Sequence, residues 1–292
     1  MRDLTDASPT AIAAERARVA HEGIGARMLA SQGADGAWHK DGEHDWLPTL
    51  YTAQLLRTTG VDPADPIVES AMTRLGTGFH WHESLGGKTF FDGETEPCIN
   101  GGTLAIGGYF GHPSESLARR LLSEQLEDGG WNCDAPKSVR SSYHSTICVL
   151  EGLLEYERAA GSAGSGGSAP DVATARHRGE DYFLQRGLFR RLSTGEVAHP
   201  DFLKFAYPTR YCYDVLRALD YFRAAGAQPD ARMADAVHIV ESRQQSDGRW
   251  LLDDTHNEAL VFPFTESTGE PSRWNTLRAL RVLRWFAPAT PR

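Results

Sequence analysis

The stretch that decides the fold runs from residue 125 to residue 156 and reads QLEDGGWNCDAPKSVRSSYHSTICVLEGLLEY. Its first seven residues are mostly polar and contain two glycines, which is typical of a turn that closes a helix. In its second half Ile147, Leu150 and Leu154 recur at the spacing of a helix that buries one face. We therefore expect a helix, a tight turn and a second helix.

Polar and reactive side chains crowd between this turn and the second helix, namely Cys133, Arg140, Tyr143 and His144. The unpaired N–H groups and the positive dipole end of a helix N-terminus favour anions and thiolates. The start of the second helix is therefore the first candidate for a functional site.

The pattern QxxDGxW occurs three times, at residues 32–38, 125–131 and 244–250, each time ahead of an apolar helical segment. Self-similarity of this kind is typical of repeat architectures. The pattern predicts a helix that ends at the glutamine, a reversal permitted by glycine, and a tryptophan packed between layers. The alternative is a chance recurrence of turn residues.

Helix periodicity extends over most of the chain, and sustained alternation of apolar and polar residues is nearly absent. The predicted pairs of outer and inner helices are 12–31 with 48–58, 64–75 with 98–110, 115–126 with 142–157, 174–188 with 208–223, and 230–243 with 271–286. A proline stands at or just before four inner-helix starts, as is typical of helix N-termini: Pro48, Pro97, Pro208 and Pro271. We therefore predict an all-α chain.

The segment AGSAGSGGSAP at residues 160–170 predicts a flexible Gly/Ser loop. Such a segment could link two domains, but the helix pairs continue unchanged across it. We therefore expect a surface loop within a single domain that spans residues 1–292. The long connections at 76–97 and 251–271 are expected to fold over a cavity.

Composition and charge exclude several classes of partner. The formal net charge of −9 argues against nucleic acid and anionic membranes as main partners. No run of eighteen apolar residues occurs, so no transmembrane segment is expected, and the N-terminus lacks the features of a signal peptide. The four cysteines, at positions 98, 133, 148 and 212, have no close pairs and indicate a reducing, cytoplasmic location rather than a disulfide framework. Free thiols are then available to bind a metal.

The three QxxDGxW segments resemble the QW repeat of the terpenoid cyclase and protein prenyltransferase superfamily, and the resemblance covers nearly the whole chain. The stretches PCINGG, DGGWNC, YDVLRALDYFR and SRWNTLRALRVLRW are similar to those of bacterial squalene cyclase-like proteins. The resemblance implies a single α/α toroid of five to six helical hairpins, with the inner helices lining a cavity.

A second resemblance is to the β subunits of protein prenyltransferases. In those enzymes an Asp, a Cys two residues later and a His at the opening of a later helix hold the catalytic zinc. The matching residues are Glu96 and Cys98 in EPC, and His144 in SSYHSTICVLEGL. The resemblance therefore implies Zn²⁺ as a cofactor and a helical partner subunit.

Cys133, on the loop ahead of His144, completes a predicted metal-ligand set of Cys98, Cys133 and His144, because thiolates and imidazole are good zinc ligands. Three protein ligands would leave one position open for chemistry. Glu96 is then a further ligand, a partner of a ligand or a general base. Alternatively, the cysteines are small buried residues and His144 caps its helix. Cys148, one turn later, is expected in the core.

Two features differ from the family pattern. The DxDD acid motif of the cyclases that protonate an alkene is absent. The segment KTFFDGETEPC carries Asp92, Glu94 and Glu96 where prenyltransferases clamp diphosphate with Arg and Lys. Diphosphate would therefore be repelled unless other cations compensate, the candidates being Lys88, Arg140, Arg210 and Arg273.

Arginine and aromatic residues gather at three of the predicted inner-helix starts. The predicted substrate-binding residues are Arg140, Tyr207, Arg210, Tyr211, Cys212, Arg273 and Trp274. The arginines would suit a carboxylate, sulfate or phosphate, and the aromatics would wall an apolar part of the pocket. The alternative for each arginine is a salt bridge to an acidic loop. The candidate catalytic residues are Glu96, Tyr143 and Asp214. His80 and His82 would supply an extra metal ligand if their loop folded inward, and the alternative is surface exposure.

The sequence therefore predicts a zinc-dependent enzyme that acts on a small or isoprenoid-like ligand of anionic character, by transfer or lyase chemistry. A metal-free terpenoid cyclase-like enzyme is one alternative. A non-catalytic binding or partner module with a structural zinc is the other, and a closed four-ligand site would favour it.

Overall fold

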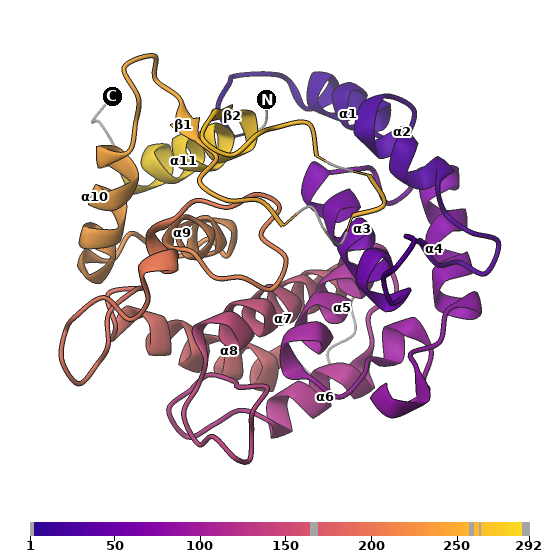
Figure 1. Cartoon of the computed structure of the whole chain (residues 1–292), viewed down its shortest axis with the longest axis horizontal. Helices are drawn as coiled ribbons and strands as arrows, with labels where there is room; N and C mark the ends of the chain where they lie inside the picture. The colour runs from indigo at the N-terminus through magenta and orange to yellow at the C-terminus, as the bar shows by residue number, and fades with distance from the viewer. Residues whose placement is uncertain (1–2, 164–168, 257–259, 263, 288–292) are drawn as a thin grey trace. The chain divides into compact units, whose positions relative to one another are not determined.

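The structure, a computed structural model, describes residues 3–163, 169–256, 260–262 and 264–287. Over these residues the chain is mostly helical, as predicted, with eleven α-helices and one pair of two-residue strands (Figure 1). None of the described helices is both long enough and apolar enough to cross a membrane.

The contacts within the chain define two compact units. The larger unit comprises Ala7–Gly179 and Asn257–Pro263, and the smaller unit comprises Met1–Asp6, Glu180–His256 and Phe264–Arg292. The boundary between residues 179 and 180 falls inside helix α8 (Ala169–Leu184). The single toroid stays a prediction.

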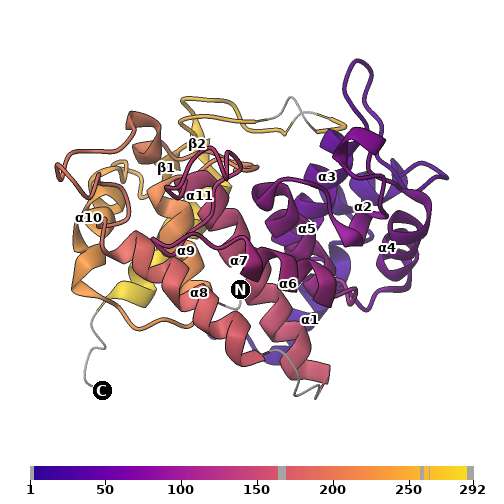
Figure 2. The same cartoon turned by 90° about the horizontal axis from the view of Figure 1, so that it is seen from below.

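Seven of the described helices belong to the larger unit. They are α1 (Pro9–Arg18), α2 (Gly23–Ala30), α3 (Trp46–Thr59), α4 (Pro66–Gly78), α5 (Pro97–Tyr109), α6 (Glu115–Ser123) and α7 (Tyr143–Ala163). Helix α5 contacts α3 and α7, and α6 packs against both α5 and α7, as Figures 1 and 2 show. Two 3-10 helices, Glu83–Leu85 and Phe90–Asp92, lie between α4 and α5.

The smaller unit is built on two helices that pack together, α9 (Val215–Ala224) and α11 (Arg273–Phe286), with α10 (Ala234–Ser242) in contact with both. The strands β1 (Trp250–Leu251) and β2 (Pro271–Ser272) pair antiparallel directly ahead of α11. Two further 3-10 helices, Pro200–Leu203 and Ala231–Met233, precede α9 and α10.

The three QxxDGxW segments fold in the same way. Each tryptophan is fully buried, and its indole N–H donates to the carbonyl oxygen ten residues earlier, at 2.7 Å in all three copies. The amide N–H of each tryptophan donates to a threonine hydroxyl in the next helix, α3, α7 or α11; the pairs are Trp38–Thr49, Trp131–Thr146 and Trp250–Thr276. The repeat is therefore real, and the alternative of chance recurrence is wrong.

The glutamine and glycine of each repeat also keep their predicted roles. The side-chain amide of Gln32, Gln125 and Gln244 donates to the carbonyl of the repeat glycine, which has a positive φ in every copy. Because only glycine adopts this conformation without strain, the reversal needs it. In the first two copies the same glutamine also donates to a carbonyl of a later helix, Ala71 in α4 and Ala175 in α8.

Helices α5 and α7 touch through their backbones. A Cβ atom on Gly101 would lie 2.4 Å from the carbonyl oxygen of Cys148, and one on Gly152 would lie 2.5 Å from the carbonyl oxygen of Gly101. Further along, a Cβ on Gly108 would lie 2.7 Å from the backbone of Glu155. Gly101 of α5 meets Cys148 of α7, and the later residue Gly108 meets the later residue Glu155. The two helices α5 and α7 therefore run in the same direction.

Several predicted boundaries were wrong. The helix expected at 12–31 is two helices, α1 and α2, separated at Gly23, which has a φ of +60°. The inner helix expected from Pro208 begins only at Val215, because the Asp214 side chain accepts the Arg217 amide and caps the helix there. Of the predicted Gly/Ser loop, residues 164–168 lie outside the described residues, and α7 and α8 extend into the rest.

Adjacent glycines in α5 offer a matched test of this packing. We expect Gly101→Ala to lower the free energy of unfolding by about 1–3 kcal/mol, because its Cβ meets backbone that cannot swing away. At Gly102 the nearest atom to a Cβ is Leu50 Cδ1 at 3.7 Å, an ordinary contact. Gly102→Ala should therefore be neutral or stabilise by up to about 1 kcal/mol.

Urea denaturation of the two variants measures this difference. Equal stabilities for Gly101→Ala and Gly102→Ala would contradict the backbone contact between α5 and α7.

Candidate metal centre

Three groups able to bind a metal come together in the larger unit, at the start of α5. One carboxylate oxygen of Glu96 and the sulfur atoms of Cys98 and Cys133 all lie within 4.8 Å of one another. Glu96 is the exposed residue just before α5, and Cys98 is the second residue of the helix and 9% exposed. Cys133 is half-buried, on the loop ahead of α7. The structure thus brings together two of the predicted ligands and one predicted catalytic residue.

The turn that carries Glu96 is held from two sides. Asn100, which is fully buried, accepts the Glu94 amide through Oδ1 at 2.7 Å and donates to the Glu94 carbonyl through Nδ2 at 3.0 Å. Arg120 of α6 donates to the Glu94 carbonyl and, at 2.9 Å, to the Thr95 carbonyl. These bonds satisfy the backbone of the turn and fix where Glu96 stands.

Glu94 is a buried carboxyl group directly beside the site, 3% exposed. Its oxygens accept the amides of Thr95 at 2.5 Å and of Glu96 at 2.6 Å. Burial raises the pKa of Glu94, and the two backbone hydrogen bonds oppose the rise. Glu94 therefore orients the backbone at Glu96, leaving the Glu96 side chain directed at Cys98, whose sulfur lies 3.7 Å from Glu96 Oε2.

Cys133 is positioned by the first turn of α7. Its amide donates to Ser145 Oγ at 3.3 Å, and its sulfur lies 3.3 Å from the same oxygen. Ser145 is 3% exposed. Because Gly101 of α5 meets Cys148 of α7, Cys98 lies level with Ser145, three residues earlier on each helix. Two residues before Cys133, the amide of Trp131 is bonded to Thr146, the residue after Ser145. The second QxxDGxW repeat thus holds the loop on which Cys133 lies.

The thiols of Cys98 and Cys133 shift each other's pKa. The interaction with the Cys98 thiol holds the pKa of Cys133 below its ordinary value, and Ser145 adds to this effect while burial opposes it. The interaction with Cys133, together with burial, raises the pKa of Cys98.

The donor set fits zinc. Thiolate sulfur and carboxylate oxygen are both ordinary zinc ligands, and two thiolates disfavour magnesium and calcium. On a tetrahedral ion with Zn–S of about 2.3 Å and Zn–O of about 2.1 Å, a sulfur and an oxygen ligand stand about 3.6 Å apart. The separation of Cys98 Sγ and Glu96 Oε2, 3.7 Å, matches this spacing. The cluster can therefore hold a metal ion without rearrangement of this pair.

The other predicted residues near α7 take different positions. His144 is the second residue of α7, half-buried and next to Ser145, but it stands outside the three-residue cluster. Tyr143 opens the helix and is 9% exposed, whereas Arg140 is exposed on the preceding loop. Cys148 is 3% exposed, as expected of a core residue. A ligand role for His144 stays a prediction.

Aromatic residues predicted to bind substrate form a stack within the smaller unit. The rings of Tyr207 and Trp274 are parallel to within 7°, with centroids 4.9 Å apart, and Phe264 packs against Tyr207 at 5.3 Å. Tyr211 is 43% exposed, and Cys212 is half-buried, with burial raising the pKa of its thiol. These rings therefore pack against one another, and a role for them in lining a substrate pocket stays a prediction.

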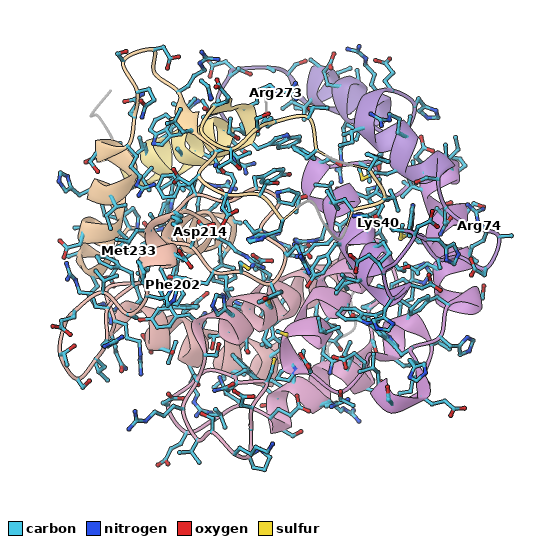
Figure 3. All side chains as sticks on the ribbon, viewed as in Figure 1. Lys40, Arg74, Phe202, Asp214, Met233 and Arg273 are labelled. Carbon is cyan, nitrogen blue, oxygen red and sulfur yellow. The ribbon has the colours of Figure 1, made fainter. Side chains whose placement is uncertain are left out.

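Two of the charged residues predicted in the smaller unit, Asp214 and Arg273, lie at the starts of α9 and α11, and both are labelled in Figure 3. Asp214 is 3% exposed, caps α9 and lies 3.5 Å from Arg278, and burial raises its pKa. Arg273, at the start of α11, pairs with Glu266 at 3.2 Å and is 78% exposed. This ion pair matches the alternative prediction for Arg273, a salt bridge to an acidic loop. The Arg210 carbonyl accepts the side chain of Arg217 at 3.0 Å.

Three residues of the site were not predicted from the sequence, namely Asn100, Arg120 and Ser145. Asn100 and Ser145 lie within the quoted stretches PCINGG and SSYHSTICVLEGL, next to the residues that were predicted. The signal for Asn100 was a polar side chain on an otherwise apolar helix start, whereas Ser145 stands among other polar residues. Arg120 gave no such signal, because it lies on an amphipathic helix whose exposed face carries another arginine, Arg119.

A cleft of about 550 Å³ elsewhere in the larger unit contains His80 and His82, with His44, Asp35 and Asp45 also in its wall. His80 and His82 are exposed, which was the alternative prediction for them. Neither belongs to the cluster of Glu96, Cys98 and Cys133. The two aspartates of this cleft are both bonded to one histidine, His39, at 3.1 Å and 2.9 Å.

No family model matches this chain, and no curated protein matches it in sequence.

Adjacent arginines in α6 test how the Glu96 turn is held. We expect Arg120→Ala to speed hydrogen exchange of the Thr95 and Glu96 amides and to cost roughly 1–2 kcal/mol, because it removes charged donors from two carbonyls of the turn. Arg119→Ala is the matched control, since Arg119 is 70% exposed and pairs only locally with Glu115. Equal exchange rates in both variants would show that Arg120 does not hold the turn.

The His39 contacts predict a pH dependence of stability. Hydrogen bonds to Asp45 and then Asp35 raise the pKa of His39 above its ordinary 6.5. The contribution of His39 to the free energy of unfolding is therefore fully present below its ordinary pKa and is lost as pH rises through its raised pKa. We expect His39→Gln to lower the melting temperature at about pH 5.5 more than at about pH 8.5. A larger effect at the higher pH would contradict this assignment.

Proposed function

We propose that this chain is a zinc-dependent enzyme related to the prenyltransferases and terpenoid cyclases, with Glu96, Cys98 and Cys133 holding the metal. The observation that carries the proposal is the meeting of two thiols and one carboxylate within 4.8 Å, at the start of α5 and on the loop ahead of α7. Two thiolates in one site are soft ligands of the kind that zinc binds.

The exposure of the three residues supports a catalytic rather than a purely structural metal. Cys98 is almost fully buried, Cys133 is half-buried and Glu96 is exposed, so the cluster has an accessible side. Three protein ligands leave a fourth position for water or substrate. A bound zinc would supply Lewis acidity and make a water or thiol in that position acidic near neutral pH.

The role proposed for the chain's own residues follows from their positions. Cys98 and Cys133 would fix the metal against α5 and α7, and Ser145 would orient Cys133. Glu96, on the accessible side, would bind the metal or move a proton at its Oε atoms. Glu94 and Asn100 would keep the Glu96 backbone in place.

The proposed ligand is a small or isoprenoid-like molecule, changed by transfer or lyase chemistry in an α/α toroid. The parallel α5 and α7 and the repeated tryptophan bonds support this architecture. Because the acidic residues Asp92, Glu94 and Glu96 directly precede α5, diphosphate is disfavoured as the group recognised there.

A non-catalytic module with a structural zinc is the second candidate, favoured by the burial of Cys98. It requires a fourth protein ligand, and His144, which adjoins Ser145, is the residue that the family resemblance supplies. The two candidates therefore differ in whether His144 joins Glu96, Cys98 and Cys133 as a fourth ligand.

Zinc content measured by mass spectrometry of the purified chain tests the proposal. We expect about one zinc per chain. Cys98→Ser and Cys133→Ser should each weaken zinc binding at least about tenfold, because each removes a thiolate from the metal. Cys148→Ser is the matched control, since Cys148 is a buried thiol outside the cluster, and it should keep the metal.

Zinc content unaffected by the Cys98 and Cys133 substitutions would overturn the assignment. His144→Ala tests whether a fourth ligand closes the site: unchanged zinc content favours the open site, and loss of zinc favours the closed one.

A further inference from the structure

Cys98 and Cys133 have a second chemistry that does not need a metal. Both are free thiols, their sulfur atoms lie within 4.8 Å of each other, and they come from different elements, α5 and the loop ahead of α7. A disulfide has an S–S bond of about 2.05 Å. A shift of up to about 2.8 Å between the two sulfurs would therefore close the bond.

We propose that Cys98 and Cys133 are an oxidation site, at which peroxide oxidises the two thiols to an intramolecular disulfide. We further propose that this disulfide and bound zinc exclude each other. The first part rests on the geometry of the two thiols alone. The second part rests on the proposed function, because it needs both sulfurs to be zinc ligands.

The two cysteines have different roles in this reaction because they differ in access and in freedom to move. Cys133 is half-buried and lies on a loop, so peroxide reaches its sulfur first and the loop can carry it toward Cys98. Cys98 is 9% exposed and fixed in the first turn of α5, next to the backbone contact with α7. It is the resolving thiol.

The reaction balances with one hydrogen peroxide per pair. The Cys133 sulfur attacks one peroxide oxygen, an S–O bond forms as the O–O bond breaks, and water leaves with a sulfenic acid on Cys133. The Cys98 sulfur then attacks the Cys133 sulfur, the S–S bond forms, and the hydroxyl leaves as a second water with the thiol proton. Two thiols are oxidised and one peroxide is reduced to two waters.

Zinc would oppose this reaction for a simple reason. A thiolate bound to zinc has its lone pair engaged and its position fixed, so it attacks peroxide more slowly. Conversely, a disulfide offers no thiolate to the metal. Oxidation would therefore release zinc from the cluster, and reduction by an added dithiol would restore the site.

The test uses the full chain, stripped of metal and treated with hydrogen peroxide in small excess. We expect an intact mass lower by two hydrogen atoms, reversed by a dithiol reductant. Trypsin separates the candidates, because Cys98, Cys133 and Cys148 fall in the fragments 89–119, 121–137 and 141–158. The expected link joins the first two fragments, in the unaltered chain and in Cys148→Ser alike.

Two further arms complete the experiment. Cys133→Ser should lose this link, and one equivalent of zinc should slow its formation in the unaltered chain at least about tenfold. No link between fragments 89–119 and 121–137, or a link to fragment 141–158 instead, would overturn the oxidation site and leave the zinc proposal standing. A link that forms equally fast with zinc bound would overturn the exclusion and count against the cysteines as ligands.

Discussion

The close contact between α5 and α7 is the constraint on which the larger unit depends. Gly101 and Gly152 meet backbone to backbone, and no other residue type has room at either position. Because the two helices run in the same direction, their first turns lie at one level. Cys98 therefore comes beside Ser145, and through Ser145 beside Cys133. The candidate metal-binding cluster is a consequence of helix packing as much as of the cysteines themselves.

The QxxDGxW repeat explains how the loops between the helices keep a fixed shape. Each buried tryptophan ties the end of one helix to the start of the next, through its indole and its amide. In the second copy this bond fixes the segment that leads into Cys133. A loop that would otherwise be mobile is thus held at both ends, which gives a loop residue a defined place in the cluster. The three copies share this device, but only the second is followed by a cysteine that joins a metal-binding cluster.

Much of this could be predicted from the sequence because it depends on local pattern. The three repeats and the helical character follow from residue types at fixed spacing, whereas Glu96 and Cys98 were matched through the resemblance to prenyltransferase β subunits. The predicted start of α9 was wrong. A proline often marks a helix start, so Pro208 was chosen, but capping by Asp214 places the start at Val215. Arg120 could not be predicted, because its partner Glu94 lies 26 residues away and meets it only after α5 and α6 have packed.

The most direct test of the central claim is zinc K-edge X-ray absorption on the chain loaded with one equivalent of zinc. The account predicts two sulfur atoms at about 2.3 Å, with the remaining ligands oxygen or nitrogen at about 2.0–2.2 Å. Loss of one sulfur in Cys133→Ser would assign that ligand. A zinc ion surrounded only by oxygen and nitrogen would contradict the account, because it would place the metal away from Cys98 and Cys133.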